Sequence, residues 1–239
     1  MLNYKKILFT GGSGRFGKTF KNIHGFKNYI YPSSKEFNIL KFNSIKNYLK
    51  KKKTDLVVHC AGLSRPMKIH DEDIVKSIDL NIIGTCNLVK ACSQLKIKII
   101  YFSTCYVYPG LKGDYKEQDP LFPANNYAWS KLGGEAAVIL YKNSLILRIS
   151  MTEKPFIHKS AFKNFITNFI FHDEVAKFLP KLFKYKGIIN IGGPSQSPYK
   201  FAKKYNPQIK GIFIKKTNNK KRLINFSMNI KKLKRIISD

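Results

Sequence analysis

The stretch Ile7–Lys18, which reads ILFTGGSGRFGK, decides the fold that we expect for this chain. In it an apolar run ends in a glycine-rich turn, and the turn leads into a segment that can form a helix. Gly12, Gly14 and Gly17 fit the spacing G-x-G-x-x-G, and a register that starts at Gly11 fits T-G-x-x-G-x-x-G equally well. Glycine allows a tight strand-to-helix turn, a close approach of the backbone to a diphosphate, and close packing of the helix on the strand. The pattern therefore predicts a dinucleotide-binding turn, in which N–H groups at the helix start face the anion.

Strand-like and helix-like segments alternate after this turn, which favours that interpretation over a turn that merely ends a strand. Short apolar runs predict strands at Lys5–Thr10, Tyr29–Tyr31, Leu56–Cys60, Ile97–Phe102 and Leu145–Leu147. Helical spacing of apolar residues predicts helices at Arg15–Lys21, Ser44–Lys53, Asp71–Ser93 and Tyr127–Tyr141. The third of these helices is expected to bury Ile74, Ile78, Ile82 and Val89. The alternation predicts an α/β fold with a Rossmann-type doubly wound parallel sheet.

We expect the chain to have two parts. Residues 1–150 form an NAD(P)-binding Rossmann domain, and residues 151–239 add a strand and a helix to the sheet together with a small, reduced substrate-binding lobe. The elements expected in the second part are a helix at Asp173–Phe183, a strand at Ile188–Ile191, a helix capped by Ser197 with Pro198 at its first position, a strand at Phe213–Ile214, and a last helix that Ser227 caps and that runs to Ile237. This part would supply the surface that contacts a substrate.

The composition indicates a folded protein without a membrane span. Of the 239 residues, 44% are hydrophobic, which is enough for a sizeable core. No apolar run approaches the ~18 residues of a membrane span, and the N-terminus does not resemble a signal peptide. The four cysteines lack C-x-x-C spacing and do not cluster with the five histidines. We therefore expect reduced thiols, no metal site and a cytoplasmic location.

The formal net charge of +30 raises the alternative of a basic nucleic-acid-binding protein. Only five of the 44 cationic residues are arginine, although nucleic-acid readers favour arginine for bidentate contacts. The lysines are spread from end to end, and we interpret the denser clusters at Lys50–Lys53 and Lys215–Arg235 as solvated faces. We expect no specific nucleic-acid partner, and the positive charge would attract small anionic ligands instead.

Three polar residues carry the candidate chemistry. Tyr127 and Lys131 form a Y-x-x-x-K pattern, and residues four apart lie on one face of a helix. Thr104 follows the predicted strand Ile97–Phe102, at the carboxyl edge where open α/β sheets bind ligands. A tyrosine pKa near ~10 must fall toward ~7 for efficient acid–base catalysis, and a lysine at ~4 Å contributes enough only in a partly dry cleft. We therefore expect Lys131 to lower the pKa of Tyr127.

Several motifs in order along residues 1–150 resemble one family. They are TGGSGRFG at Thr10–Gly17, DLVVHCAG at Asp55–Gly62, NIIGT at Asn81–Thr85, FSTCYVYPG at Phe102–Gly110, YKEQDP at Tyr115–Pro120 and YAWSKLGGE at Tyr127–Glu135. Together they resemble the extended short-chain dehydrogenases/reductases, that is, the NAD-dependent epimerase/dehydratase family. Within it, the likeness is greatest to the dTDP-4-dehydrorhamnose reductases and related sugar-nucleotide-binding proteins.

The resemblance implies an activity and a role for each catalytic candidate. Tyr127 would be the proton donor, Lys131 would hold the nicotinamide ribose, and Thr104 would bind the substrate carbonyl. The implied reaction is the NAD(P)H-dependent reduction of a 4-keto-6-deoxy nucleotide sugar, as in the synthesis of surface polysaccharides. The expected partner is thus a nucleotide-sugar substrate, and the expected assembly is a homodimer.

The cofactor site implied by the resemblance extends over three turns. Its expected residues are Gly11, Gly14, Arg15, Phe16, Gly17, Ser33, Ser34, Lys35, Ala61, Gly62 and Lys131. The backbone of Arg15 and Phe16 would donate to the diphosphate, and Ala61 and Gly62 would pass beside the adenosine half. No acidic residue stands at the end of the second strand, where NAD selectivity normally places one to bind the ribose 2′-hydroxyl. Because Ser33–Lys35 offers small hydroxyls and a cation that suit a 2′-phosphate, we expect NADP(H) in preference to NAD(H).

Two positions depart from the family pattern, and other functions stay open. Cys105 stands where the reductases usually carry aspartate, and Asn38 stands where an aspartate near the adenine is common. A nucleotide-sugar 4-epimerase uses the same three catalytic residues, so the sequence does not separate it from a reductase. A 4,6-dehydratase typically has Asp-Glu where this chain has Cys105 and Tyr106. A non-catalytic regulatory subunit that binds NADP or a nucleotide sugar is the remaining alternative, supported by the short chain and by Cys105.

Overall fold

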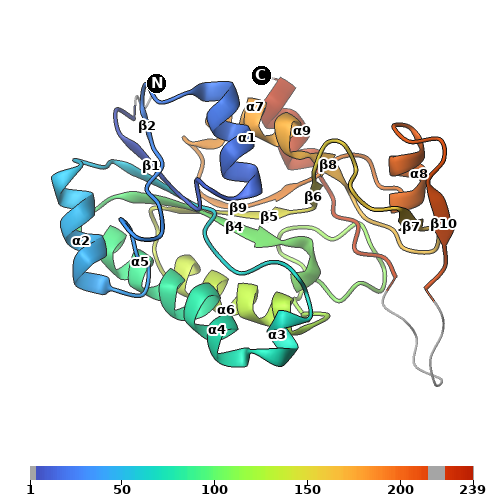
Figure 1. Ribbon diagram of the computed structural model, residues 1–239, viewed down its shortest axis with the longest axis horizontal. Coiled ribbons are helices and arrows are strands. Elements are labelled where there is room, and N and C mark those ends of the chain that lie inside the picture. Colours follow the sequence, from blue (N-terminus) through green and yellow to red (C-terminus); the bar gives the residue numbers. More distant parts are fainter. Residues whose placement is uncertain (1–3, 215–223, 239) are drawn as a thin grey trace.

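The computed structural model describes residues 4–214 and 224–238, and a six-stranded parallel sheet lies at its centre (Figure 1). The strands are β1 (Ile7–Thr10), β2 (Tyr29–Ile30), β3 (Leu56–His59), β4 (Lys98–Thr104), β5 (Ser144–Ile149) and β9 (Gly187–Ile191). Their order across the sheet is β2-β1-β3-β4-β5-β9, so the chain reverses its direction of travel between β1 and β3. Ligands of open α/β sheets bind at the carboxyl ends of the strands beside such a reversal. The predicted doubly wound α/β fold is confirmed.

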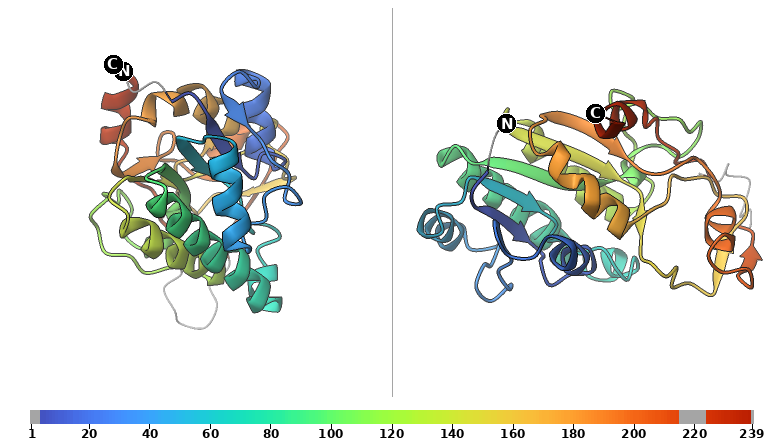
Figure 2. Two further views of the ribbon diagram at one scale, coloured as in Figure 1. Left: turned by 90° about the vertical axis from the view of Figure 1, so that its left-hand side faces the viewer. Right: turned by 90° about the horizontal axis from the view of Figure 1, so that it is seen from above.

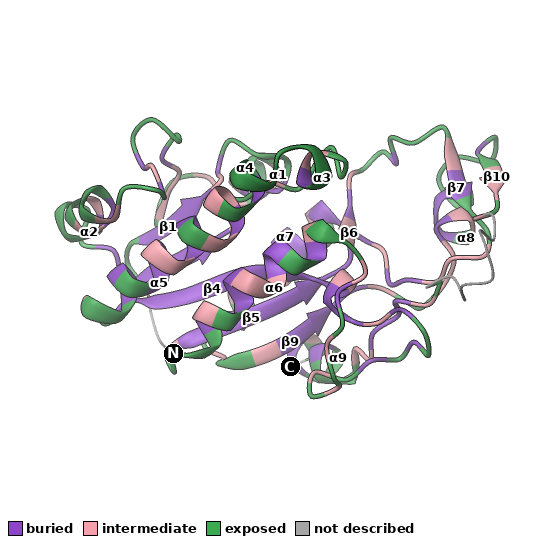
Figure 3. Cartoon of the chain, turned by 90° about the horizontal axis from the view of Figure 1, so that it is seen from below, coloured by how far each residue is buried: buried purple, intermediate pink, exposed green. Residues whose placement is uncertain are grey.

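Helices cover both faces of the sheet (Figure 2). One group is α1 (Arg15–His24), α7 (His172–Leu182) and α9 (Lys231–Ser238), and the other is α2 (Phe42–Lys51), α5 (Gly84–Gln94) and α6 (Asn126–Ile139). Successive residues of β1 face the two groups in turn, because Ile7 and Phe9 pack with the first group and Leu8 packs with the second. The central strands are buried on both sides (Figure 3), which explains why they are continuous apolar runs in the sequence.

The long helix expected at Asp71–Ser93 is wrong, because the segment is broken. Its pieces are α3 (Ile69–Glu72), α4 (Ile74–Ile78), a π-helical turn (Asp79–Ile83) and α5. Asp73 separates the first two helices and caps the second, where its carboxylate accepts the N–H of Lys76 at 2.9 Å. The π-helical turn then changes the helical repeat, so the apolar face does not continue in one direction. As a result Ile74 and Ile78 are exposed, whereas Val89 is buried as expected.

Residues after 150 contribute α7, β9 and α9 to the sheet layers and also form a small lobe beside the sheet (Figure 1). In this region β6 (Met151–Thr152) pairs with β8 (Ile170–Phe171), β7 (Ser160–Phe162) pairs with β10 (Lys210–Ile212), and α8 spans Pro198–Lys203. Ser197 caps α8 as expected, since its hydroxyl accepts the N–H of Lys200 at 3.1 Å. The strand expected at Phe213–Ile214 is wrong, because β10 ends at Ile212. A division into two parts at residue 150 stays a prediction.

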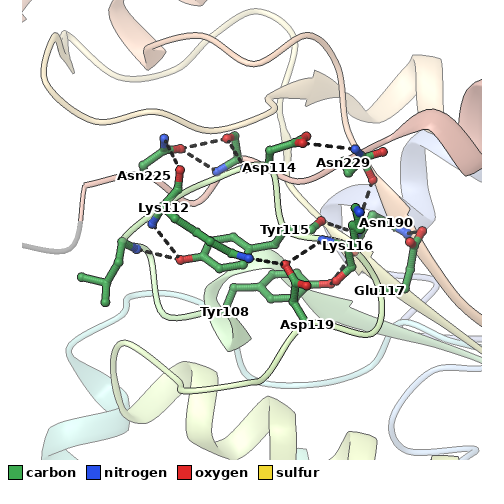
Figure 4. A network of polar contacts seen from close by, with 12 residues as sticks. Tyr108, Lys112, Asp114, Tyr115, Lys116, Glu117, Asp119, Asn190, Asn225 and Asn229 are labelled. Atoms are coloured by element: carbon green, nitrogen blue, oxygen red, sulfur yellow. Dashed lines mark hydrogen bonds and ion pairs between the residues drawn. The ribbon is translucent and has the colours of Figure 1, made fainter.

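The start of the last helix also differs from the expectation. It begins at Lys231 and not after Ser227, and the side chain of Asn229 accepts the Lys231 N–H at 3.1 Å. Ser227 instead accepts the Asp114 N–H at 3.0 Å, and it lies between Asn225 and Asn229, which Figure 4 shows beside the polar loop after β4. The Tyr115 N–H donates to the Ser227 carbonyl at 3.0 Å, and the Tyr115 carbonyl accepts from the Asn229 N–H and from the Asn190 side chain, each at 2.8 Å. These bonds tie the loop to β9 and to the end of the chain.

All four side chains of Lys50–Lys53 are exposed, in agreement with a solvated face. Residues 215–223 of the second cluster, Lys215–Arg235, lie outside the described residues. None of the helices in the described part of the chain is long and apolar enough to cross a membrane.

Candidate active site

A cleft with a volume of about 1380 Å³ lies at the carboxyl ends of β1, β3, β4 and β5. Its walls come from the glycine turn after β1, the turn after β2, the loops after β3 and β5, helix α6 and the lobe. The glycine turn and α6 therefore face one common space. This is the edge of the sheet at which the sequence predicts a ligand site.

The glycine turn adopts the register that begins at Gly11. Gly11 has a φ of +72°, and a Cβ there would lie 2.8 Å from the backbone nitrogen of Ala61, so glycine is required on both counts. Gly14 caps α1 and lines the cleft. A Cβ on Gly17 would lie 2.5 Å from the Gly11 carbonyl, which explains the close packing of α1 on the turn. Gly12 does not line the cleft, and a Cβ there would meet the side chain of Tyr31 at 2.7 Å.

The structure brings the three catalytic candidates together. Thr104 is the last residue of β4, and Tyr127 and Lys131 lie one turn apart near the start of α6. The start of α6 is fixed by Asn125, whose side chain accepts the Ala128 N–H at 2.9 Å. The cleft is lined by Thr104, Tyr127 and Lys131. The side chain of Thr104 lies within hydrogen-bonding reach of the Tyr127 hydroxyl. The Lys131 ammonium is buried and lies 4.1 Å from the ring centre of Tyr101.

Burial sets the protonation states of this group. Burial raises the pKa of Tyr127 to about 12, Cys105 adds to the rise, and Thr104 and the charge of Arg65 only partly oppose it. Burial also lowers the pKa of Lys131 to about 8, which Cys60 and Glu135 partly oppose. The charge that lowers the pKa of Tyr127 is thus that of Arg65 and not, as expected, that of Lys131. The phenol is a neutral proton donor near pH 7, and its pKa has not been brought toward 7.

Asn81 connects α6 to the loop after β3. Its side-chain oxygen accepts the Leu63 N–H at 2.7 Å, and its amide donates to the Leu63 carbonyl at 2.9 Å and to the Ser130 hydroxyl at 2.8 Å. A Cβ on Gly62 would lie 2.8 Å from the same Asn81 oxygen, so only glycine lets the loop pass this closely. The contact fixes the backbone at Gly62 beside Lys131, whose ammonium would be 3.9 Å from that Cβ.

A buried ion pair anchors the other end of α6. Arg148 of β5 donates from Nη2 to Glu135 at 2.6 Å, and both side chains are 3% exposed. Glu135 also accepts the Ser103 hydroxyl at 2.6 Å, and Arg148 also donates to the Tyr108 hydroxyl at 2.8 Å. The pair joins α6 to the carboxyl ends of β4 and β5, one turn beyond Lys131. The positions of Tyr127 and Lys131 relative to Thr104 therefore depend on it.

In the turn after β2, only some of the residues that are expected to bind the adenosine end of the cofactor line the cleft. Ser34 and Lys35 line the cleft, and so does Asn38. Ser33 does not line it, because its hydroxyl donates to the Glu36 carboxylate at 2.8 Å within the turn. A 2′-phosphate placed at this turn would therefore have Ser34 and Lys35 as its side-chain partners.

The remaining cofactor candidates also face the cleft, and so do residues that the sequence did not single out. Arg15, Phe16, Ala61 and Gly62 are among its lining residues, and Cys105, which departs from the family pattern, lines the cleft too. The missed residues include Arg65, Glu153, His158, Phe169 and His172. Only Arg65 could have been noticed in the sequence, because it is one of only five arginines in a lysine-rich chain.

A nicotinamide dinucleotide fits the donors that are present. The start of α1, the side chains of Ser34 and Lys35, and the side chains of Tyr127 and Lys131 line one cleft, and backbone N–H groups at a helix start can bind an anion. The glycine turn leaves this path open, because a Cβ at Gly14 would meet only the Gly11 carbonyl, at 3.0 Å. The residues expected to bind each part of the cofactor remain predictions.

Curated relatives match about three fifths of the chain. Methionine adenosyltransferase 2 subunit beta from Pongo abelii is 30% identical over 158 residues, which cover 61% of this chain and 46% of that protein. The dTDP-4-dehydrorhamnose reductase from Mycolicibacterium smegmatis is 28% identical over 142 residues, 58% of this chain and 42% of that protein. The aligned region thus covers less than half of each relative.

Solved structures match over nearly the whole chain. The dTDP-4-dehydrorhamnose reductase from Bacillus anthracis in complex with NADP has a TM-score of 0.82 at 20% identity, covering 98% of this chain and 92% of that one. A hypothetical dTDP-4-dehydrorhamnose reductase from Sulfolobus tokodaii has a TM-score of 0.84 at 24% identity, covering 98% and 95%. At these identities the likeness establishes the fold. The RmlD substrate binding domain family matches residues 5–174, and the chain therefore belongs to this family.

Proposed function

We propose that this protein uses NADPH to reduce the 4-keto group of a nucleotide-linked 6-deoxy sugar. The observation that carries the proposal is the meeting of Thr104, Tyr127 and Lys131 in one cleft that begins at a dinucleotide-type glycine turn. Membership of the RmlD substrate binding domain family supports it, as does a relative that is named a dTDP-4-dehydrorhamnose reductase.

In this proposal each of the three residues takes one step of the reaction. Thr104 donates a hydrogen bond that orients the ketone, and Lys131 binds the nicotinamide ribose. The cofactor, when bound, supplies the hydride to the carbonyl carbon. Tyr127 then gives its proton to the alkoxide oxygen. The raised pKa of Tyr127 suits this direction, because the phenol stays protonated until it meets a base as strong as an alkoxide.

The pH dependence of kcat/KM follows from Lys131. Its pKa in the free protein is about 8, so the ammonium is present below this pH and is lost above it. We expect kcat/KM to fall as the pH rises through about 8, with no second fall from Tyr127 in this range, because its pKa is about 12. A pH profile of NADPH oxidation measures this. In Lys131→Arg the charge persists, so the fall near pH 8 should vanish, and an unchanged fall would assign it to another group.

The preference for NADP(H) over NAD(H) depends on Lys35 in this proposal. We expect Lys35→Ala to weaken NADP⁺ binding about three- to tenfold, because an exposed ammonium–phosphate contact is lost, and to leave NAD⁺ binding unchanged. Isothermal titration calorimetry with both cofactors measures this. Lys51→Ala is the matched control, since Lys51 is exposed but does not line the cleft. Equal losses for both cofactors in Lys35→Ala would contradict the assignment.

An assay of cofactor consumption tests the proposed reaction. The protein is incubated with NADPH and a 4-keto-6-deoxy nucleotide sugar, and both product and oxidised cofactor are counted. One NADPH consumed for each product formed supports the reductase. Product formed from a nucleotide sugar without net change of the cofactor would show a 4-epimerase instead.

A non-catalytic nucleotide-binding subunit is the second candidate. The observation that favours it is the 30% identity to relatives named as a subunit of methionine adenosyltransferase 2. The retained Thr104, Tyr127 and Lys131 argue against it, because a binding subunit has no need of a proton donor. NADP(H) binding without turnover across a panel of nucleotide sugars would select it.

A further inference from the structure

Three charged side chains from distant parts of the sequence meet over the cleft. Arg15 begins α1, Arg65 lies in the loop after β3, and Glu153 follows β6. One oxygen of Glu153 lies 3.1 Å from Nη1 of Arg15 and 3.0 Å from Nη1 of Arg65. Arg65 also donates to the other carboxylate oxygen at 3.3 Å. Because all three residues line the cleft, the cluster bridges three of its walls.

The cluster leaves much of both guanidinium groups open. The Glu153 side chain is 14% exposed, whereas those of Arg15 and Arg65 are 47% and 37% exposed. Each arginine contacts Glu153 through Nη1, and the described residues offer no acceptor to its Nε or Nη2. Since a guanidinium has five N–H donors, each arginine keeps donors for a ligand.

Glu153 is an unusual residue for this place. It is the one acidic side chain among the described residues that line the cleft, and lysines stand elsewhere along the same walls. A lone carboxylate would repel an anionic ligand, but together with two arginines it leaves a net charge of +1. Two guanidinium groups this close would repel each other without it. Its place between them indicates that Glu153 holds the two arginines together.

We infer that Arg15 and Arg65, held by Glu153, form a clasp that grips the diphosphate of a bound nucleotide. A diphosphate suits the clasp better than a monophosphate, because each phosphoryl group can take the donors of one guanidinium. Arg15 directly follows the glycine turn, and the clasp lines the same cleft as Tyr127. The inference rests on the proposed function, because the cofactor and the nucleotide sugar of that reaction both carry a diphosphate.

Binding to the full chain, measured by isothermal titration calorimetry, tests the clasp. Each diphosphate is compared with a ligand that lacks it: NADP⁺ with 2′-AMP, UDP with UMP, and dTDP with dTMP. We expect Arg65→Ala to weaken the binding of at least one of the diphosphate ligands about tenfold or more. The binding of the matched ligand without a diphosphate should weaken less than threefold. Arg65→Lys should recover little of the preference for diphosphate ligands, because lysine is a point charge and lacks the planar guanidinium that binds phosphate through two N–H groups. A loss for NADP⁺ alone assigns the clasp to the cofactor, and a loss for UDP or dTDP alone assigns it to the nucleotide sugar.

Two further variants separate the clasp from general electrostatic attraction. Lys68→Ala removes one positive charge near Arg65 in the sequence but outside the cleft lining, and it should change no affinity more than twofold. Glu153→Gln makes the cleft more positive. We nevertheless expect it to reduce the preference for diphosphate over monophosphate at least threefold, because the carboxylate that pairs with both arginines is lost. A larger preference in Glu153→Gln would overturn this role, since Glu153 would then be a competitor of the ligand.

The outcome also distinguishes failure of the clasp from failure of the proposed function. If the unaltered protein binds these ligands and Arg65→Ala keeps its diphosphate preference, the clasp is overturned and the proposed function stands. If the unaltered protein binds none of them, both are overturned. Melting temperatures of the variants should match that of the parent within a few degrees, because partly exposed ion pairs contribute little to stability.

Discussion

Tyr127→Phe is expected to lower kcat for ketone reduction about 10²–10⁴-fold, which is the usual contribution of a positioned general acid. The variant loses one hydroxyl and keeps the ring that packs against His70, so the fold and the cleft should persist. Cofactor affinity should change little, because we assign the ribose contact to Lys131. The measurement is NADPH oxidation under saturating substrate, together with the dissociation constant of NADP⁺.

The neighbouring Tyr141→Phe is the matched control. Tyr141 follows α6, and its hydroxyl donates to the Ile97 carbonyl at 3.0 Å, away from the cleft. It removes the same hydroxyl near the same helix, and kcat should stay within about twofold of the parent. A Tyr127→Phe variant that retains the parent rate would remove the proton-donor role and, with it, the main argument for an enzyme over a binding subunit.

The sequence predicted the parts of the fold that depend on local pattern. Strands buried on both faces are continuous apolar runs, and the cap at Ser197 followed by Pro198 marks a helix start that the structure confirms. The register of the glycine turn could not be decided in this way, because both spacings fit. Only the packing decides it: Gly12 lies against Tyr31, whereas Gly11 has a positive φ and lies against Ala61.

The broken helix shows where local pattern fails. Apolar residues at helical spacing from Ile74 to Val89 form a continuous stripe in the sequence, but a helix break at Asp73 precedes this stripe and a π-helical turn at Asp79–Ile83 interrupts it. The turn places Asn81 where it can bond Leu63 and Ser130, and this tertiary requirement outweighs the spacing. The sequence feature that marks the break is Asn81, a polar residue among the apolar residues of the stripe.

Long-range charge pairs were likewise beyond the sequence. Arg65 and Glu153 are 88 residues apart, and no motif connects them. The expected effect of Lys131 on Tyr127 was wrong for a related reason, because spacing on a helix gives proximity but not burial. Burial is the largest cause of the pKa shifts of both residues here, and the spacing of residues along a helix does not reveal it.

The largest expected effect on stability is that of Arg148→Met. The change leaves the Glu135 carboxylate buried without its cation, and breaking a buried pair in this way costs about 3–5 kcal/mol. For a domain of this size the melting temperature should fall by roughly 10 °C. Thermal and urea unfolding measure the change, with Arg235→Met as a matched control in the last helix of the chain.

The double variant Glu135→Leu/Arg148→Met separates the cost of an orphaned charge from the value of the pair. It removes both charges, and Tyr108 keeps a partner because its hydroxyl also donates to Asn190 at 2.8 Å. We expect the double variant to recover most of the stability, since apolar replacement of a buried pair is often neutral. If it is as unstable as Arg148→Met, the pair itself stabilises the fold. If stability recovers and kcat does not, the pair serves to hold α6, and with it Tyr127, in register with Thr104.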